Sequence, residues 1–190
     1  MNLKNFFAVA LLAIAAPSFA QTYKIDPSHT YPSFEADHKG GLSIWRGKFN
    51  KTSGTISLDR AKKTGTMEIV IDATSIDFGM SKMNDHAKSK DMFSVEQFPS
   101  ITYKGTAMKF EGEKLVSVDG ELTLLGVTKP LTLTVNKFKC VEDKMTKREV
   151  CGADASAEFK RSDFGLSYGI QYGFAPEVKL AIQVEAMKTE

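Results

Sequence analysis

Three histidines are the side chains of this sequence best suited to chemistry near neutral pH: His29, His38 and His86. Three imidazoles can hold a zinc ion and leave a fourth position open. The spacing argues against such a site, because His29 and His38 are nine residues apart and would face opposite sides of an unbroken strand. We therefore predict no metal site. We expect His38 to point toward a pocket, and we expect His29 and His86 to lie at its mouth or to make ordinary hydrogen bonds.

The two cysteines, Cys140 and Cys151, flank the polar stretch "VEDKMTKREV". Redox-active pairs usually have only two residues between the cysteines, and this pair does not. We predict a structural disulfide that closes a loop. Such a bridge should contribute about 3 kcal/mol to stability on the chain-entropy argument.

Support for nucleophilic catalysis is weak, and motifs for nucleotide binding are absent from the sequence. It has no P-loop and no dinucleotide fingerprint. Carboxylate pairs such as Asp85 and Asp91 have the pattern of ordinary solvated surface. We therefore predict a protein that is not an enzyme and needs no cofactor.

One basic residue, Arg161, has two interpretations. It could pair with Asp163 or a neighbouring strand, or its guanidinium could contact the oxygens of a ligand, which suit its planar fork. The segment that follows, "FGLSYGIQYGF" at residues 164–174, combines glycines with aromatic residues. It could be a flap over the mouth of a pocket or a plain loop.

The elements that must position these residues are mostly strands, because hydrophobic residues recur with a period of two. Phe34, Ala36 and His38 share one strand face, and a long apolar stripe runs through Val116, Val118, Gly120, Leu122 and Leu124. The segment "LTLLGVTKPLTLTV", residues 122–135, is typical of a hairpin. Long alternating strands joined by turns indicate an antiparallel barrel or sandwich. A short helix is expected within residues 82–93, with Ser81 as its N-cap.

The first twenty residues have the pattern of a signal peptide: Lys4, an apolar run, and Ser18-Phe19-Ala20 before the cleavage site. We predict cleavage after Ala20, which leaves residues 21–190 as one exported, periplasmic domain without a stable membrane anchor. Its net charge is near +1. This balance argues against a nucleic-acid-binding protein, which would carry a basic stripe.

Large aromatic side chains are spread along the strands. Eight strands closed on themselves leave room either for these side chains or for one small ligand. On composition alone the aromatic residues could simply fill the core. An apolar tube, however, would bind a lipid chain with about 0.8 kcal/mol for each buried methylene.

Several segments in order resemble the YceI-like family of lipid- or polyisoprenoid-binding proteins. They are "DPSHTYPSFEADHKGG", "DHAKSKDMFSVEQFPSITYKGT", "GELTLLGVTKPLTLTV", "FKRSDFGL" and the final "VKLAIQVEA". The resemblance covers essentially the whole chain after the signal peptide. It implies an all-β fold, an extended lipocalin-like antiparallel barrel of about eight strands with a short helix. It also implies an isoprenoid-tailed lipid of the quinone or polyprenyl phosphate type in the tube, and often a homodimer.

Pro32 departs from the family pattern and indicates a strand start, an edge or a bulge. Under the lipid-binding hypothesis the tail lies along the tube and the headgroup sits near its mouth. The expected ligand-binding residues are Phe34, His38, Trp45, Phe49, Phe78, Tyr103, Arg161 and Phe164. Two alternatives stay open: a barrel with a solid core that binds a protein partner, and a metal-binding protein that uses the histidines.

Overall fold

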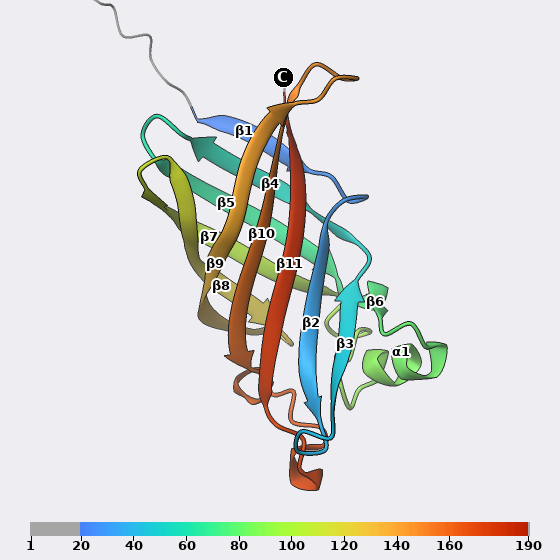
Figure 1. Ribbon diagram of the computed structural model, residues 1–190. Helices are drawn as coiled ribbons and strands as arrows, with labels where there is room; N and C mark the ends of the chain where they lie inside the picture. Colours follow the sequence, from blue (N-terminus) through green and yellow to red (C-terminus); the bar gives the residue numbers. More distant parts are fainter. Residues whose placement is uncertain (1–19, 190) are drawn as a thin grey trace, which may run out of the picture.

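The computed structural model describes residues 20–189, so nearly all of the expected signal peptide lies outside the described residues. The described chain is dominated by antiparallel strands (Figure 1). They are β1 (Gln21–Ile25), β2 (Tyr31–His38), β3 (Ser43–Phe49), β4 (Thr52–Asp59), β5 (Thr64–Asp72), β6 (Ile76–Asp77), β7 (Ser100–Glu111), β8 (Lys114–Leu124), β9 (Val127–Glu142), β10 (Glu149–Lys160) and β11 (Glu177–Lys188). The helices are α1 (Ser81–Lys88) and the short 3-10 helices η1 (Ala73–Ser75), η2 (Arg161–Phe164) and η3 (Ile170–Tyr172).

The sheet closes on itself, which confirms the predicted barrel. Its order β1-β4-β5-β7-β8-β9-β10-β11 returns to β1 through pairs such as Tyr23 with Lys188 and Ile25 with Ala186. These eight strands form the closed ring. Closure leaves this part of the sheet without a free edge, so its backbone groups are paired within the barrel.

Strand β11 has two partners along one edge. Its C-terminal part pairs with β1, and its residues Val178–Gln183 pair with β2. Strands β2 and β3 therefore extend the wall beyond the ring, with β6 beside β3. Pro32 is the second residue of β2 and precedes the first β2–β3 pair, Ser33 with Lys48. Of the three contexts that the sequence allowed for this proline, a strand start, an edge or a bulge, the structure shows a position next to the strand start.

Alternation of side chains decides which residues enter the core. In β9, Leu131, Leu133 and Val135 are buried while their neighbours are exposed, as the sequence pattern predicted. In β8 the predicted stripe is wrong at its first residue. The register shifts opposite Lys109 and Phe110, so Leu115 rather than Val116 is buried at this point. One extra residue in a strand reverses the faces of those before it.

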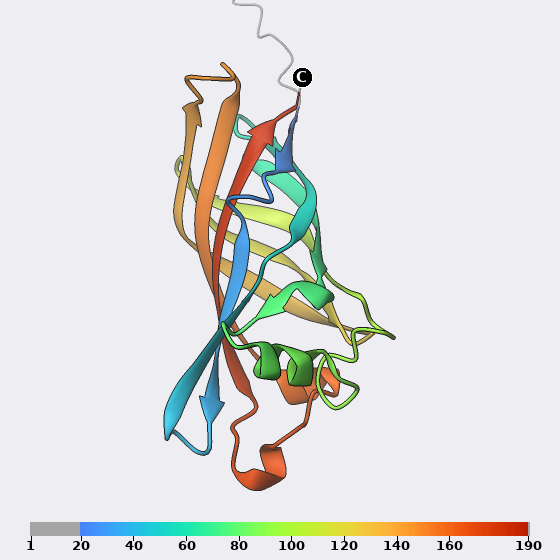
Figure 2. The same cartoon turned by 90° about the vertical axis from the view of Figure 1, so that its right-hand side faces the viewer.

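One end of the barrel carries the non-strand elements: α1, the β2–β3 turn and the loop that contains η2 and η3 (Figures 1 and 2). Asp37 joins two of them, because its carboxylate accepts hydrogen bonds from the backbone N–H groups of Ala175, Gly40 and Gly41. These bonds lower the pKa of Asp37, and the bond from Ala175 has the largest effect. We call this the helix end of the barrel.

Helix α1 begins one residue before the predicted segment, because Ser81 is its first residue rather than its cap. The capping position is Met80, which makes no side-chain cap hydrogen bond. Asn84 instead organises the approach to the helix: its Oδ1 accepts from Phe78 N at 2.7 Å and its Nδ2 donates to Asp77 at 3.0 Å. None of the helices within residues 20–189 is long and apolar enough to span a lipid bilayer.

The hairpin of β9 and β10 carries the predicted disulfide at the opposite end. Cys140 and Cys151 are directly opposed in the ladder, and a disulfide joins them. It therefore closes the turn at residues 143–148, as expected from the polar sequence between the cysteines.

Candidate functional site

A cavity with a volume of about 360 Å³ runs inside the barrel. It falls in the range of ligand pockets, about 300–1,000 Å³. Its walls are the inward faces of the strands, and most lining side chains are aliphatic or aromatic. Strand β11 alone contributes Val178, Leu180, Ile182, Val184 and Ala186.

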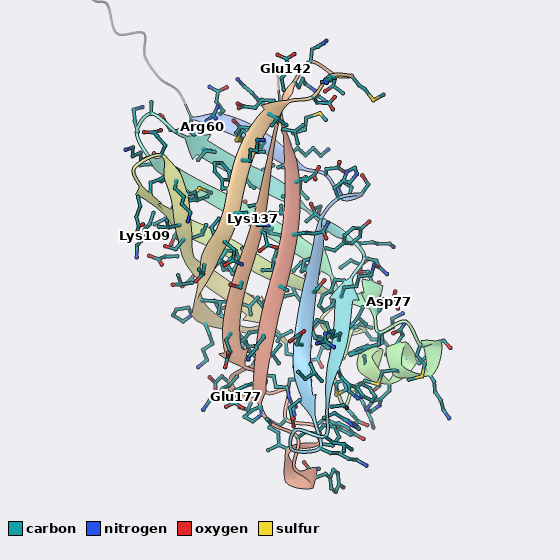
Figure 3. All side chains as sticks on the ribbon, in the orientation of Figure 1. Arg60, Asp77, Lys109, Lys137, Glu142 and Glu177 are labelled. Atoms are coloured by element: carbon teal, nitrogen blue, oxygen red, sulfur yellow. A yellow bond between two sulfur atoms is a disulfide. The ribbon has the colours of Figure 1, made fainter. Side chains whose placement is uncertain are left out.

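Charged side chains project from the outside of the same strands. Figure 3 shows Lys109 on the outer surface of β7, and its ammonium lies 2.6 Å from the Asp119 carboxylate. The barrel thus separates a charged exterior from an apolar interior. That division makes the cavity suited to an apolar guest.

Aromatic rings gather on one wall of the cavity. The Phe34 ring lies 5.9 Å from Phe49 and 5.4 Å from Phe78, and Phe78 lies 6.1 Å from Trp45. All four residues line the cavity, and Phe49 also packs edge-on against Phe93. The tilted and edge-to-face arrangements are those that aromatic quadrupoles favour. The structure therefore brings four of the predicted ligand-binding residues together.

The helix end of the cavity is lined by aromatic rings and histidines. His38 stacks on Trp45 at 4.7 Å and meets Phe174 edge-on at 5.1 Å. His86 of α1 meets Tyr168 at 4.8 Å. Tyr168 lines the cavity and is also 43% exposed, so this end is where the interior meets solvent.

Tyr103 crosses the interior on the opposite wall. Its hydroxyl lies 3.0 Å from the carbonyl oxygens of both Val118 and Leu131, to which it donates. Burial raises the pKa of Tyr103 well above its usual range, with a smaller contribution from the charge of Asp119. The phenol is therefore neutral and already bonded, and it offers the cavity an aromatic face rather than a charge.

Arg161 lies at the helix end and is only 7% exposed. Its guanidinium donates to the carbonyl oxygens of Leu166 at 2.8 Å, Tyr168 at 2.9 Å and Ala175 at 3.3 Å. Within residues 20–189 it makes no salt bridge, so the expected pairing with Asp163 is not found. Burial lowers its pKa. Arg161 lines the cavity and at the same time holds the loop that carries Tyr168.

One predicted residue, Phe164, does not line the cavity. It is 3% exposed and packs edge-on against Phe159, at 5.3 Å between ring centroids, and Phe159 is the ring that faces the interior. The helical turn η2 takes Phe164 out of strand alternation, so parity could not place it. Sequence reasoning also missed Met83, Met92, Leu166 and Phe174, which lie in helical or irregular segments.

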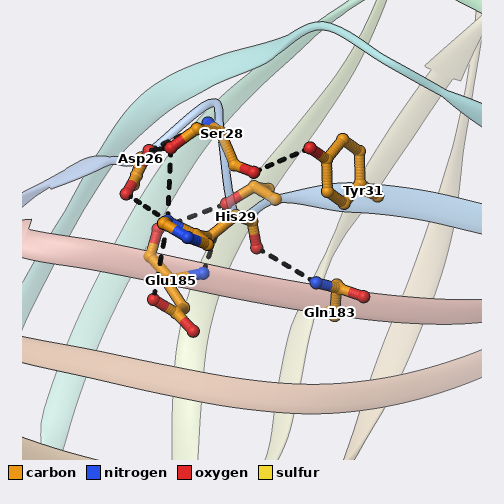
Figure 4. A network of polar contacts seen from close by, with 7 residues as sticks. Asp26, Ser28, His29, Tyr31, Gln183 and Glu185 are labelled. Atoms are coloured by element: carbon orange, nitrogen blue, oxygen red, sulfur yellow. Dashed lines mark hydrogen bonds and ion pairs between the residues drawn. The ribbon is translucent and has the colours of Figure 1, made fainter.

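The three histidines do not meet. His29 is not a lining residue; it lies in the loop between β1 and β2, and its Nδ1 is 2.7 Å from Asp26 and 3.9 Å from Glu185 (Figure 4). Hydrogen bonds lower the pKa of Asp26 to about 2, and the bond with His29 has the largest effect. The same bond raises the pKa of His29. Each possible metal-ligand cluster in the described part of the chain contains at most one histidine.

The comparisons with known proteins agree with this architecture. Protein YceI of Salmonella arizonae is 30% identical over 98% of this chain and 97% of its own length. The crystal structure of BcnA from Burkholderia cenocepacia superposes with a TM-score of 0.68 at 26% identity, covering 85% of this chain and 98% of the other.

A polyisoprenoid-binding domain from Saccharophagus degradans superposes with a TM-score of 0.67 at 19% identity, over 89% of this chain and 99% of the other. At that identity the likeness shows the fold alone. The sequence profile of the YceI-like domain matches residues 23–186. The eight-stranded ring, its apolar cavity and this match together place the chain in the YceI-like family.

Proposed function

We propose that this protein binds an isoprenoid-tailed lipid inside its barrel and does not catalyse a reaction. The observation that carries the proposal is the cavity itself, a space inside the barrel lined almost wholly by apolar side chains. The name of the Saccharophagus degradans relative, a polyisoprenoid-binding domain, supports the same ligand class.

Binding would rest on the removal of apolar surface from water. Strands of 12 residues, such as β7 and β11, are about 40 Å long, which gives a long chain room along the barrel axis. Each methylene that enters contributes about 0.8 kcal/mol. The polar end of the lipid would lie at the helix end, where His38, His86 and Arg161 line the cavity. Both a quinone and a polyprenyl phosphate fit this arrangement.

We further propose that the protein carries, stores or scavenges its lipid in the periplasm. The disulfide between Cys140 and Cys151 supports an oxidising compartment, since such bonds form and persist there. A homodimer remains a prediction from the family resemblance, and the sedimentation velocity of the purified protein would check it.

The alternative of a barrel with a solid core does not fit the cavity. A protein-interaction role draws some support from Tyr168 and Tyr172, which are 43% and 71% exposed at the helix end. Large exposed aromatic residues often mark contact surfaces. Such a surface is compatible with a lipid inside the barrel.

The direct experiment is native mass spectrometry of the exported protein, purified without detergent, followed by extraction of the ligand. A bound species whose homologues differ by isoprene units would establish the proposal. Titration with isoprenoids provides a second readout, because Trp45 is the chain's single tryptophan and lines the cavity. A protein that carries no lipid and shows no change in Trp45 fluorescence would overturn the proposal.

Two adjacent residues of β5 provide a matched pair of variants. Ile69 lines the cavity, whereas Val70 is 43% exposed on the outer face. Ile69→Glu places a carboxylate in the apolar interior and should abolish lipid retention, since an unpaired buried charge is strongly disfavoured. Val70→Glu adds the same charge outside and should retain the lipid. Circular dichroism would verify that both variants fold.

A further inference from the structure

Thr52 differs from the other polar groups along the cavity. Its side chain is 3% exposed and lines the cavity, yet its hydroxyl has no hydrogen-bond partner. Among the lining residues within the described part of the chain, it is the only one with a fully buried side-chain oxygen or nitrogen left unpartnered. Unpaired buried hydroxyls are rare because their desolvation is not compensated, so this one calls for an explanation.

Three other lining hydroxyls, those of Thr30, Tyr103 and Tyr23, are satisfied by the protein. Thr30 donates to the backbone oxygen of Glu185 at 3.2 Å and accepts from its N–H at 3.2 Å. Tyr103 donates to backbone carbonyls, and Tyr23 donates to Glu149 at 2.5 Å. Their hydroxyls stabilise the barrel. The hydroxyl of Thr52 has no comparable role within the described structure.

The surroundings of Thr52 are apolar. It is the first residue of β4 and shares the inward face with Ile56 and Leu58. Its partner across the ladder is Ile71, which in turn pairs with Ile101, and both also line the cavity. An ionised phosphate would be poorly solvated there, whereas a neutral oxygen needs only one hydrogen bond.

We propose that Thr52 is a hydrogen-bonding subsite for a neutral oxygen of the bound lipid, such as an alcohol or phenol hydroxyl or a ring carbonyl. This inference rests on the proposed lipid-binding function and narrows its ligand class. The hydroxyl of Thr52 can donate to or accept from such an oxygen. A phosphorylated lipid would keep its phosphate at the helix end and leave Thr52 unpaired.

The subsite would act mainly through selectivity. The Thr52 hydroxyl is buried and without a partner in the described structure. If the lipid is a hydrocarbon at this point, the hydroxyl stays without a partner and no bond is gained. If the lipid offers an oxygen, the hydrogen bond is made and binding is strengthened. The side chain therefore favours the ligand that carries an oxygen.

The test compares Thr52→Val, which keeps the shape and removes the hydroxyl, with Thr52→Ser, which keeps the hydroxyl. The probes are phytanol, phytane and phytanyl phosphate, which share one branched saturated chain and differ only at its end. Affinities come from the fluorescence of Trp45. We expect Thr52→Val to bind phytanol at least five-fold more weakly than wild type, with phytane and phytanyl phosphate little changed. Thr52→Ser should restore phytanol binding.

A change for phytanol alone distinguishes a contact from a structural effect, since a misshapen cavity would weaken the binding of all three probes. Thr30→Val is the matched control: it removes a hydroxyl that the protein already satisfies, so it should lower the melting temperature without changing the ratio of phytanol to phytane affinity. Equal phytanol affinity in wild type and Thr52→Val would overturn the subsite alone. If the wild type binds none of the three probes, the proposed function and the subsite both fail.

Discussion

The Phe34 ring lies directly over Gly47, its partner across the β2–β3 ladder. A Cβ added at Gly47 would lie 2.6 Å from Phe34 Cζ, well inside contact distance. The glycine therefore leaves the space that the ring occupies on the cavity wall. Because Phe34 also contacts Phe49 and Phe78, the position of this one ring sets the shape of the aromatic cluster.

Gly47→Ala should displace Phe34 and disturb the cluster. We expect the free energy of unfolding to fall by about 1–3 kcal/mol, as for other overpacked cores, and lipid affinity to fall with it. Gly152→Ala is the control, because the nearest atom to its new Cβ would be 3.7 Å away and Gly152 also lines the cavity. Denaturant unfolding would compare the two; equal stability would contradict the steric role of Gly47.

Ala155 has a small side chain that faces the cavity, so a larger residue at this position can fill the cavity without removing core side chains. It is 6% exposed, lies on the inner face of β10 and lines the cavity. Ala155→Phe should occupy space that the lipid needs, so lipid retention should be lost while the barrel keeps its far-UV spectrum. Ala181→Phe, on the outer face of β11, should retain lipid. Normal lipid retention by Ala155→Phe would show that the lipid does not occupy this part of the cavity.

The disulfide should stabilise the barrel rather than take part in binding. Replacing both Cys140 and Cys151 by alanine opens the loop that the disulfide closes, whose two ends are 11 residues apart in the sequence. We expect a loss of about 3 kcal/mol or less in the free energy of unfolding, with lipid affinity retained. Thermal unfolding with and without a reductant provides the measurement. A melting temperature that does not respond to reduction would show that the bridge adds no stability.

Alternation predicted the cavity walls well where a strand is regular. Leu131, Leu133 and Val135 follow from parity alone, because each lies two residues from the next on one uninterrupted face. The same argument chose Val116 instead of Leu115, since a register shift is decided by pairing with the neighbouring strand. Local sequence does not contain that information.

The helix end was harder to predict because its residues follow no period. Phe164 was expected at the ligand and packs behind Phe159, whereas Phe174 was not expected and lines the cavity. Arg161 illustrates the same point: its partners are backbone carbonyl oxygens, which every residue carries. The residue types in the sequence therefore do not show which backbone carbonyl groups will bind Arg161. Thr52 was missed because an unpartnered hydroxyl is a property of the packed barrel.

Acid stability should depend on the contact between Asp26 and His29 (Figure 4). The folded pKa of Asp26 is about 2, below its ordinary 3.8, so its contribution is present above pH 3.8 and is lost as the pH falls toward 2. The folded pKa of His29 is raised above 6.5, so its contribution is present below pH 6.5 and is lost as the pH rises through the raised pKa. The pair should stabilise the fold most between these limits.

Asp26→Asn tests this dependence. Denaturant midpoints measured at about pH 3, 5 and 8 should show the largest difference from wild type at pH 5, since both partners are charged there. The variant should also lose less stability than wild type on acidification from pH 5 to pH 3. His29→Gln should remove the alkaline part of the dependence, because it leaves no imidazole to titrate. A constant difference between Asp26→Asn and wild type across the three pH values would mean that this ion pair does not govern the response to pH.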